Sequence, residues 1–283
     1  MHSEFISLPQ RRLFLIRSDA STTACQPIVT VLLGAFAEEM NKSRHLFSQC
    51  RQQLAATGGS YVQMDPYGTG DSDGDLDQTT VLEWRADLQA LLALLQQRGY
   101  QAVNFIAMRF GALQLFDLLA QAEPLPLPLH KIVLWQPYLQ PSQFLQQFFR
   151  LKVAEQMALG EKTSQQQLQQ QLDNGEVLEI AGYPLTAAFV QSVKQLTDVS
   201  QWLVSQAQLA TTAQQPATKT PLLWLETSTL PNLSPVVQKS VEQLSALFDT
   251  QVTLLAGAPY WTATELVACP ELISATVDFL QEE

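Results

Sequence analysis

The residues between Asn104 and Phe116, NFIAMRFGALQLF, follow the order in which many enzymes present a nucleophile. β-favouring residues run into a tight turn that contains Gly111, and a leucine-rich helix comes next. In enzymes with this strand–turn–helix unit, the turn reads G-x-S-x-G and exposes the serine hydroxyl. Here the turn runs from Ala107 to Gly111, and Arg109 stands at the serine position. A guanidinium has no usable lone pair and stays protonated in proteins, so it cannot attack an acyl group.

The partners that a nucleophilic serine would need are also incomplete. A carboxylate is expected after a later strand, and Glu226 ends the run PLLWLE in a suitable place. A histidine is expected after the last strand, but the sequence there is GAPYWTATE, with Tyr260 and Trp261. No histidine follows His130, which precedes a strand and so belongs to the opposite edge of a parallel sheet. Glu226 is then either an acid without an imidazole to orient or a solvated glutamate at a strand end.

The surroundings of Arg109 should carry negative charge. Its side chain is expected to point into the space above the sheet, at a helix N-terminus whose partial positive charge disfavours a cation. The compensating anion is either a bound carboxylate or phosphate, or a side chain, with Glu38 or Glu39 first and Asp71 second. The alternative is that Arg109 extends to solvent from a turn without function. A ligand pocket at this place would also include Met108, Phe36 and Trp261 in its expected lining.

One other hydroxyl lies in the glycine-rich run DPYGTGDSDG, which follows a strand. Ser72 could substitute for the missing nucleophile, but no histidine base is placed for it in sequence order. The glycines allow a tight loop beside the pocket, and we expect Asp65 and Asp71 to fix the loop backbone through hydrogen bonds. Ser72 is therefore a weak candidate.

The elements that must position these residues alternate between short strands and longer helices. Strands are expected at 4–8, 12–17, 27–34, 60–65, 102–107, 131–136, 221–226 and 251–256. Helices are expected from about Ser43, as N-cap, to 57, and at 79–97, 110–122, 235–248 and 270–281. This alternation predicts an α/β protein with a doubly wound, mostly parallel sheet of about eight strands. Together with the turn at Arg109, it predicts the α/β-hydrolase fold.

The segment 137–220 interrupts the alternation. It is rich in glutamine and mainly helical in period, with QQQLQQQLDNG followed by the β-like run VLEIAGY. Because it lies between two strands, it is predicted to be a cap over the carboxyl edge of the sheet, and residues 1–136 and 221–283 are predicted to form the core. A disordered polar linker is the alternative. Apolar stripes argue against the linker: Leu151, Val153, Met157, Leu168, Leu172, Phe189, Val193, Leu196 and Leu203.

Composition limits the function classes. The net charge of −11 and pI near 4.7 argue against a nucleic-acid partner or an anionic membrane surface. The N-terminal run has no signal-peptide pattern, and no stretch is long and apolar enough for a membrane span, so a cytoplasmic protein is expected. Cys25, Cys50 and Cys269 fit reduced thiols better than a disulfide framework. With three histidines and no ligand spacing among the cysteines, neither a metal nor another cofactor is expected.

Seven runs, taken together, resemble a known family. They are collinear with it over most of the chain, and their sequences are FAEEMNKSRH (36–45), YGTGDSDGD (67–75), EWRADLQALLALL (83–95), RFGALQLFD (109–117), VLWQPYLQPSQFLQQFFRLKVAEQM (133–157), VLEIAGYPL (177–185) and APYW (258–261). The family is the exosortase A system-associated hydrolase 2 family of the α/β-hydrolase superfamily. The resemblance implies a bacterial cytoplasmic protein from a gene neighbourhood for exopolysaccharide production and the sorting of PEP-CTERM proteins. It also implies that members of this branch tend to carry arginine at the serine position, so that the departure belongs to the branch rather than to this chain.

Two functions are compatible with these residues. The first is a pseudo-hydrolase whose capped pocket binds an acyl, glycan-precursor or carrier-linked small molecule through Arg109, or recognises a protein partner through the cap. The second is a hydrolase or acyl transferase of unusual design, in which Arg109 stabilises an oxyanion and Glu38 or Glu39 acts as general base. An ion pair with Arg109 would lower the pKa of such a base and weaken it. The first function is therefore preferred.

Overall fold

Eight strands form one sheet in the computed structural model, which describes residues 2–19, 27–212 and 219–282. The strand order is β1-β2-β4-β3-β5-β6-β9-β10. β2 runs antiparallel to both of its neighbours, and the pairs from β4 to β10 are parallel. The strands are β1 His2–Leu8, β2 Arg11–Ser18, β3 Ile28–Leu33, β4 Ser60–Met64, β5 Ala102–Met108, β6 Leu129–Trp135, β9 Thr220–Ser228 and β10 Phe248–Ala256. The expected doubly wound, mostly parallel sheet is confirmed.

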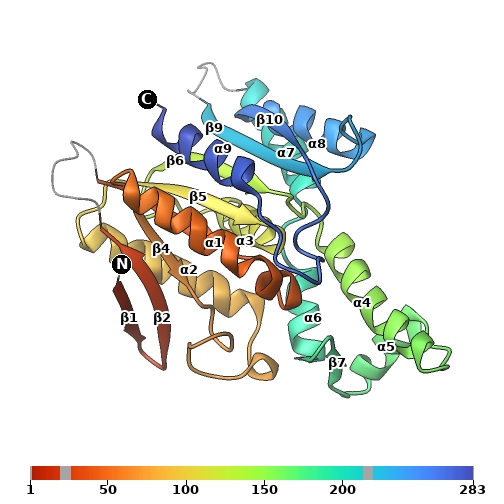
Figure 1. Cartoon of the computed structure of the whole chain (residues 1–283). Coiled ribbons are helices and arrows are strands. Elements are labelled where there is room, and N and C mark those ends of the chain that lie inside the picture. The colour runs from red at the N-terminus through yellow and green to blue at the C-terminus, as the bar shows by residue number, and fades with distance from the viewer. Residues whose placement is uncertain (1, 20–26, 213–218, 283) are drawn as a thin grey trace.

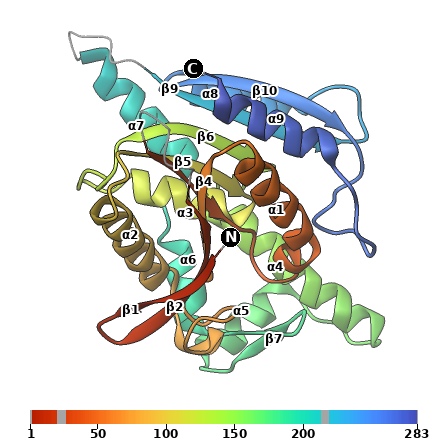
Figure 2. The ribbon, with the colours of Figure 1, turned by 60° about the vertical axis from the view of Figure 1, so that its left-hand side comes forward.

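Helices cover both faces of this sheet. On one face lie α1 and α9, in front of the strands in Figure 1; on the other lie α2, α3, α7 and α8, and Figure 2 shows α1 and α2 on opposite sides of the strands. The buried strand side chains alternate between the two clusters, as a pleated sheet requires. The helices are α1 Glu38–Ala56, α2 Val81–Gln97, α3 Phe110–Leu119, α7 Val199–Thr212, α8 Pro235–Ser245 and α9 Pro270–Gln281.

The start of α1 differs from the sequence prediction. The helix begins at Glu38, five residues before Ser43, which was the expected N-cap. Ser43 lies inside the helix, where its hydroxyl donates to the carbonyl oxygen of Glu39 at 2.6 Å. Ala37 occupies the cap position without a side-chain hydrogen bond and has a φ of 54°. The prediction was wrong because a sharp backbone turn after β3, rather than a capping hydroxyl, begins this helix. Two glutamates in its first turn complement the helix dipole and were the available signal.

The segment 137–220 contains a separate group of elements at one end of the molecule (Figure 1). Aromatic and aliphatic side chains of its helices form a cluster with Phe36, Trp84 and Phe110 of the sheet-bearing part. α7 packs elsewhere, because Val199 and Leu203 join the cluster under α3 and α8. The other elements are α4 Pro141–Ala158, α5 Gln165–Asp173, β7 Leu178–Ile180, β8 Tyr183–Leu185 and α6 Ala187–Lys194.

The cysteines, the membrane-span criterion and possible metal sites can also be compared with the sequence expectations. Cys50 is buried, and burial raises the pKa of its thiol to about 12, whereas Cys269 is half-buried. Cys25 falls outside the described residues. Among the residues that the structure describes, no helix is both long and apolar enough to cross a membrane. Within the same ranges, no three His, Cys, Asp or Glu side chains gather in a way that could hold a metal ion.

Candidate functional site

A sharp turn joins β5 to α3 at the carboxyl edge of the sheet. Arg109 is the turn residue, with a φ of 52° and a ψ of −113°, a backbone conformation that a non-glycine residue adopts only under strain. Gly111 makes the turn possible: a Cβ there would lie 2.3 Å from the carbonyl oxygen of Leu33 on β3. The backbone N–H of Arg109 donates to the carbonyl of Trp135 at 3.0 Å. The predicted strand–turn–helix unit is therefore present, with a guanidinium on it.

The guanidinium of Arg109 is buried, with 7% of the residue exposed, and makes an ion pair with Glu39. Nε lies 3.2 Å from both carboxylate oxygens, and Nη2 donates to Oε1 at 2.7 Å. Nη2 also contacts the hydroxyl of Tyr138, and the guanidinium carbon lies 4.0 Å from the Tyr138 ring centroid and 4.7 Å from that of Trp261. Nη1 makes a longer contact of 3.5 Å, to the carbonyl oxygen of Gln136. Arg109 does not extend to solvent.

Tyr138 links this ion pair to α4. Its hydroxyl lies 3.3 Å from Glu39 Oε1 and donates to Gln147 Oε1 at 2.7 Å. Burial raises the pKa of Tyr138 far above its usual value, so the phenol remains neutral. Sequence reasoning did not select Tyr138. The available signal was its place in QPY, directly after strand β6, because residues after parallel strands meet at one edge of the sheet.

Of the other acidic candidates, Glu38 and Asp71 lie apart from Arg109. Glu38 Oε1 accepts hydrogen bonds from Asn41 Nδ2 at 2.9 Å and from the Tyr183 hydroxyl at 3.3 Å. Asp71 is exposed, and its backbone N–H donates to Asp65 Oδ2 at 3.0 Å. Among the residues that the structure describes, Glu39 is the ion-pair partner of Arg109, and the second choice of Asp71 for this role was wrong. Adjacent helical residues point in different directions, which separates Glu38 from Glu39.

Glu226 lies at the carboxyl end of β9 and is buried rather than solvated. Its Oε1 accepts from Gln136 Nε2 at 2.7 Å, and its Oε2 accepts from Trp224 Nε1 at 2.8 Å. Burial raises the pKa of this carboxyl. Gln136 in turn accepts at Oε1 from the Thr227 backbone N–H at 2.8 Å, so the amide is oriented from both ends. Both oxygens of Glu226 are therefore engaged, one by Trp224 of the same strand and one by Gln136, which directly follows β6.

The histidines lie away from these groups. His130 stands near the start of β6, at the amino edge of the sheet, where its Nδ1 lies 3.0 Å from Asn104 Oδ1. His45 is on α1, and its Nε2 donates to the carbonyl of Val267 at 2.8 Å. His2 belongs to the edge strand β1.

Comparison with solved structures identifies the architecture. Est1E from Butyrivibrio proteoclasticus, with ferulic acid bound, aligns with a TM-score of 0.66 at 12% identity, over 98% of this chain and 97% of Est1E. The chain has the α/β-hydrolase fold. The enol-lactonase from Burkholderia xenovorans aligns with a TM-score of 0.60 at 13% identity, over 99% of this chain and all of that one. Mouse α/β-hydrolase domain-containing protein 10 aligns with a TM-score of 0.55 at 14% identity, over 99% and 97%.

Similarity at such low identity establishes the fold alone. No protein-family model matches the sequence, and no curated protein sequence matches it. In an α/β hydrolase the histidine of the triad follows the last strand, and here Tyr260 and Trp261 occupy the loop after β10. Tyr260 is 1% exposed, and its hydroxyl has no hydrogen-bond partner among the described residues. Its ring packs edge-on against Trp261, with centroids 5.0 Å apart, so two aromatic rings fill this loop.

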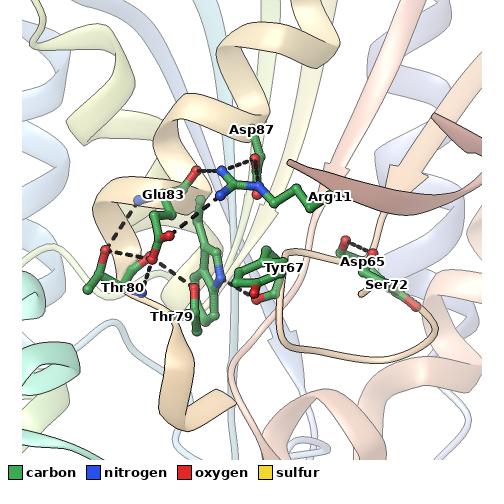
Figure 3. A network of polar contacts seen from close by, with 9 residues as sticks. Arg11, Asp65, Tyr67, Ser72, Thr79, Thr80, Glu83 and Asp87 are labelled. Atoms are coloured by element: carbon green, nitrogen blue, oxygen red, sulfur yellow. Dashed lines mark hydrogen bonds and ion pairs between the residues drawn. The ribbon is translucent and has the colours of Figure 1, made fainter. Parts of the chain in front are cut away.

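The glycine-rich loop after β4 is held by a polar network (Figure 3). Arg11 donates to the buried Asp87 from Nε at 2.9 Å and Nη2 at 2.5 Å, and Trp84 Nε1 donates to the Tyr67 carbonyl at 2.8 Å. Ser72 belongs to this network: its hydroxyl donates to the carbonyl of Asp65 at 2.5 Å. It also accepts from the Phe14 backbone N–H at 2.8 Å. Ser72 therefore serves the loop and has no imidazole beside it.

We expect Ser72→Ala to lower the free energy of unfolding by about 1–2 kcal/mol, because a buried donor and a buried acceptor both lose their partner. Ser3→Ala is the matched control, since Ser3 is exposed on β1 and its hydroxyl makes no hydrogen bond to a described residue. Urea denaturation followed by circular dichroism measures both. Equal stability of the two variants would show that the Ser72 hydroxyl does not hold the loop.

A cavity with a volume of about 240 Å³ lies beside the turn, between the loop after β3, the glycine-rich loop and α2. Its wall includes Phe36, which lies in the loop after β3, and Phe110, which directly follows Arg109. Trp84 of α2 and Tyr183 of β8 contribute further rings. Of the sequence-predicted ligand residues, Phe36 lines this cavity. The wall does not include the remaining ones: Arg109, Met108, Glu38, Glu39, Asp71 and Trp261.

Proposed function

We propose that this protein is a pseudo-hydrolase: an α/β-hydrolase scaffold that binds a small molecule without forming a covalent bond to it. The observation that carries the proposal is the buried ion pair of Arg109 with Glu39 at the position of the nucleophile. Covalent catalysis requires a nucleophilic side chain, such as a hydroxyl or thiol beside a base, or a carboxylate. The turn offers a guanidinium instead, and no histidine follows β6 in the sequence.

The neighbouring cavity, rather than Arg109 itself, is the proposed ligand site. Glu39 and Tyr138 already occupy Nε and Nη2 of Arg109, so a ligand would have only Nη1 to bind. The cavity is concave and mostly apolar with a few polar groups, as is usual for small-molecule sites. We propose that the ion pair of Arg109 with Glu39 has a structural role beside the cavity. It holds the loop after β3 against the turn. An acyl-type or anionic small molecule fits this description.

The biological setting is proposed from the family resemblance. The protein would act in the cytoplasm of a bacterium, in the exopolysaccharide and PEP-CTERM system that accompanies exosortase, on a free or carrier-linked ligand. Residues 1–136 and 221–283 would form the core and 137–220 the cap. α7 within that segment packs on the core, so the part able to move as a cap would end near α6. The exposed side of the cap would be the place for a protein partner.

The alternative, an ester or thioester hydrolase or acyl transferase, needs a carboxylate that is free to accept a proton. Glu39 is paired with Arg109, and Glu38 accepts hydrogen bonds from Asn41 and Tyr183. A water molecule or substrate would have to displace these contacts before either carboxylate could take its proton. Arg109 would also have to release Glu39 before it could bind an oxyanion. These contacts favour the pseudo-hydrolase.

We expect Arg109→Ser to gain no esterase activity, because a serine without a general base is a weak nucleophile. Its rate of ester hydrolysis should stay within about twofold of the wild-type rate. Hydrolysis of p-nitrophenyl acetate and butyrate at pH 7.5 measures this. A fluorophosphonate probe should label neither protein at a single serine. Labelling of one serine in the wild type would overturn the proposal. Turnover that is lost in a folded Arg109→Ala variant would establish the alternative.

A further inference from the structure

The cavity beside the turn has two unlike sides, which the pleat of the sheet explains. Side chains of successive strand residues point to opposite faces. Val31, Leu33 and Met64 belong to the face covered by α2, where Leu88 and Leu91 also line the cavity. Gln63 has the opposite parity and lies on the α1 side with three further polar lining groups: Asn41, Arg44 and Asp65. Gln114 of α3 and Thr69 of the glycine-rich loop are uncharged polar groups elsewhere on the wall. The cavity is therefore amphipathic across the carboxyl edge of β3 and β4.

Two arginines of α1 supply positive charge to the polar side. Arg44 and Arg51 are seven residues apart, so they lie on the same face of the helix two turns from one another. Arg44 lines the cavity, is exposed, and has no ion pair or hydrogen bond with any residue that the structure describes. Its guanidinium is thus free to bind a ligand at the cavity wall.

Arg51 is the more unusual of the two, because it is 93% buried without a carboxylate partner within ion-pair distance in the described chain. Its Nη1 donates to Gln63 Oε1, and its Nε has no partner in the described chain. A buried cation without an anion is costly in a protein interior. Gln63, which lines the cavity, stands between this charge and the cavity space.

The acidic groups nearby do not cancel the two cations. Asp65 lines the cavity, but its Oδ2 already accepts the Asp71 N–H and so fixes the glycine-rich loop. Burial raises the pKa of Asp65, which further reduces its value as a counter-ion. Glu38 is next to the cavity wall in sequence, and its Oε1 accepts hydrogen bonds from Asn41 and Tyr183. The wall thus carries Arg44 and one engaged carboxylate, and Arg51 lies behind it, bonded to Gln63.

We propose that the cavity binds a small amphipathic carboxylate, with its anionic end at Arg44 and the Arg51-backed amide of Gln63 and its apolar part between Phe36, Trp84 and Phe110. This inference rests on the proposed non-covalent function and names its ligand class. A carboxylate carries one negative charge, and Arg44 is the one described cation of the cavity wall, with no ion-pair partner of its own. A phosphate monoester carries nearly two at neutral pH and is the poorer match. Guanidinium groups recognise both kinds of anion, so the choice must be tested.

The test uses octanoate, 1-octanol and octyl phosphate as probes of the full-length protein in isothermal titration calorimetry. Octanoate should bind about tenfold more tightly than 1-octanol, as one charge-assisted hydrogen bond implies. Arg44→Gln should weaken octanoate binding by about tenfold and leave 1-octanol binding within about twofold. Arg44→Lys should retain part of the preference for octanoate over 1-octanol, and Arg51→Met should reduce that preference. Arg150→Gln, which removes an exposed arginine of α4, is the control with the same loss of charge.

The outcomes separate this inference from the function on which it rests. If 1-octanol binds but octanoate has no advantage, or if Arg44→Gln and Arg150→Gln behave alike, the carboxylate assignment is wrong and the cavity remains a ligand site. If octyl phosphate binds more tightly than octanoate, the anion is a phosphate. If no probe binds to protein that circular dichroism shows to be folded, the cavity is not a ligand site for this class and the carboxylate proposal fails, whereas the esterase and labelling assays decide the proposed function.

Discussion

Glu39→Ala is expected to lower the free energy of unfolding by about 2–4 kcal/mol, because it leaves the buried guanidinium of Arg109 without its carboxylate. Loss of one member of a fully buried pair costs about 3–5 kcal/mol. Glu39 is 22% exposed at its side chain, so water can replace part of the lost interaction. Tyr138 and Trp261 would still contact the guanidinium through their rings, but neither neutralises its charge. Urea denaturation at pH 7.5 gives the free energy of unfolding.

The neighbouring residue provides the control. Glu38 also lies in the first turn of α1, so Glu38→Ala loses the same interaction with the helix dipole, about 0.3–1 kcal/mol. Because Glu38→Ala also loses the hydrogen bonds from Asn41 and Tyr183, the difference between the two variants is a lower limit for the ion pair with Arg109. A double-mutant cycle of Glu39→Ala with Arg109→Met should give a coupling energy of at least about 1 kcal/mol. Equal destabilisation by the two alanine variants would mean that Arg109 does not depend on Glu39 for its burial.

Phe36→Ala should be at least as damaging, with a loss of about 3–5 kcal/mol. Phe36 is 5% exposed, and its ring centroid lies 5.3–6.4 Å from six other rings. They come from α2, α3 and the segment 137–220: Trp84, Phe110, Phe144, Phe148, Tyr183 and Phe189. Removal of the ring opens a space where these elements meet, and the surrounding helices can only partly close it. Thermal unfolding followed by circular dichroism measures the effect.

Phe5→Ala is the matched control for this substitution. Phe5 is 49% exposed on β1 and contacts one ring, that of Phe14, with centroids 5.4 Å apart. We expect it to cost less than about 1 kcal/mol, the value of one aromatic pair together with partial burial. If Phe36→Ala were as mild as this control, the aromatic cluster would not be what holds the segment 137–220 against the sheet. Because Phe36 also lines the cavity, the same variant should weaken binding of the apolar part of a ligand.

Some features of the site could be predicted from local sequence because they depend on local physics. The alternation of apolar runs placed the strands, and Gly111 with the β-favouring run before it placed the turn at Arg109. The need for an anion at Arg109 followed from charge alone, and Glu39 fulfils it. The choice between Glu38 and Glu39 could not be made, because it depends on where α1 begins. That point is set by the backbone turn at Ala37 and not by a capping side chain.

The sequence by itself determined the fold class, the absence of a serine from the turn and the lack of a histidine after β6, because residue identity and order are sufficient for each. Tertiary structure alone decided which groups meet. Tyr138 and Trp261 are 29 and 152 residues from Arg109 in the chain, and parallel strands bring their loops to one edge of the sheet. The cavity likewise joins α1, β4 and α2, and its polar and apolar sides arise from the pleat. Contacts between distant segments depend on packing and register, which local patterns do not encode.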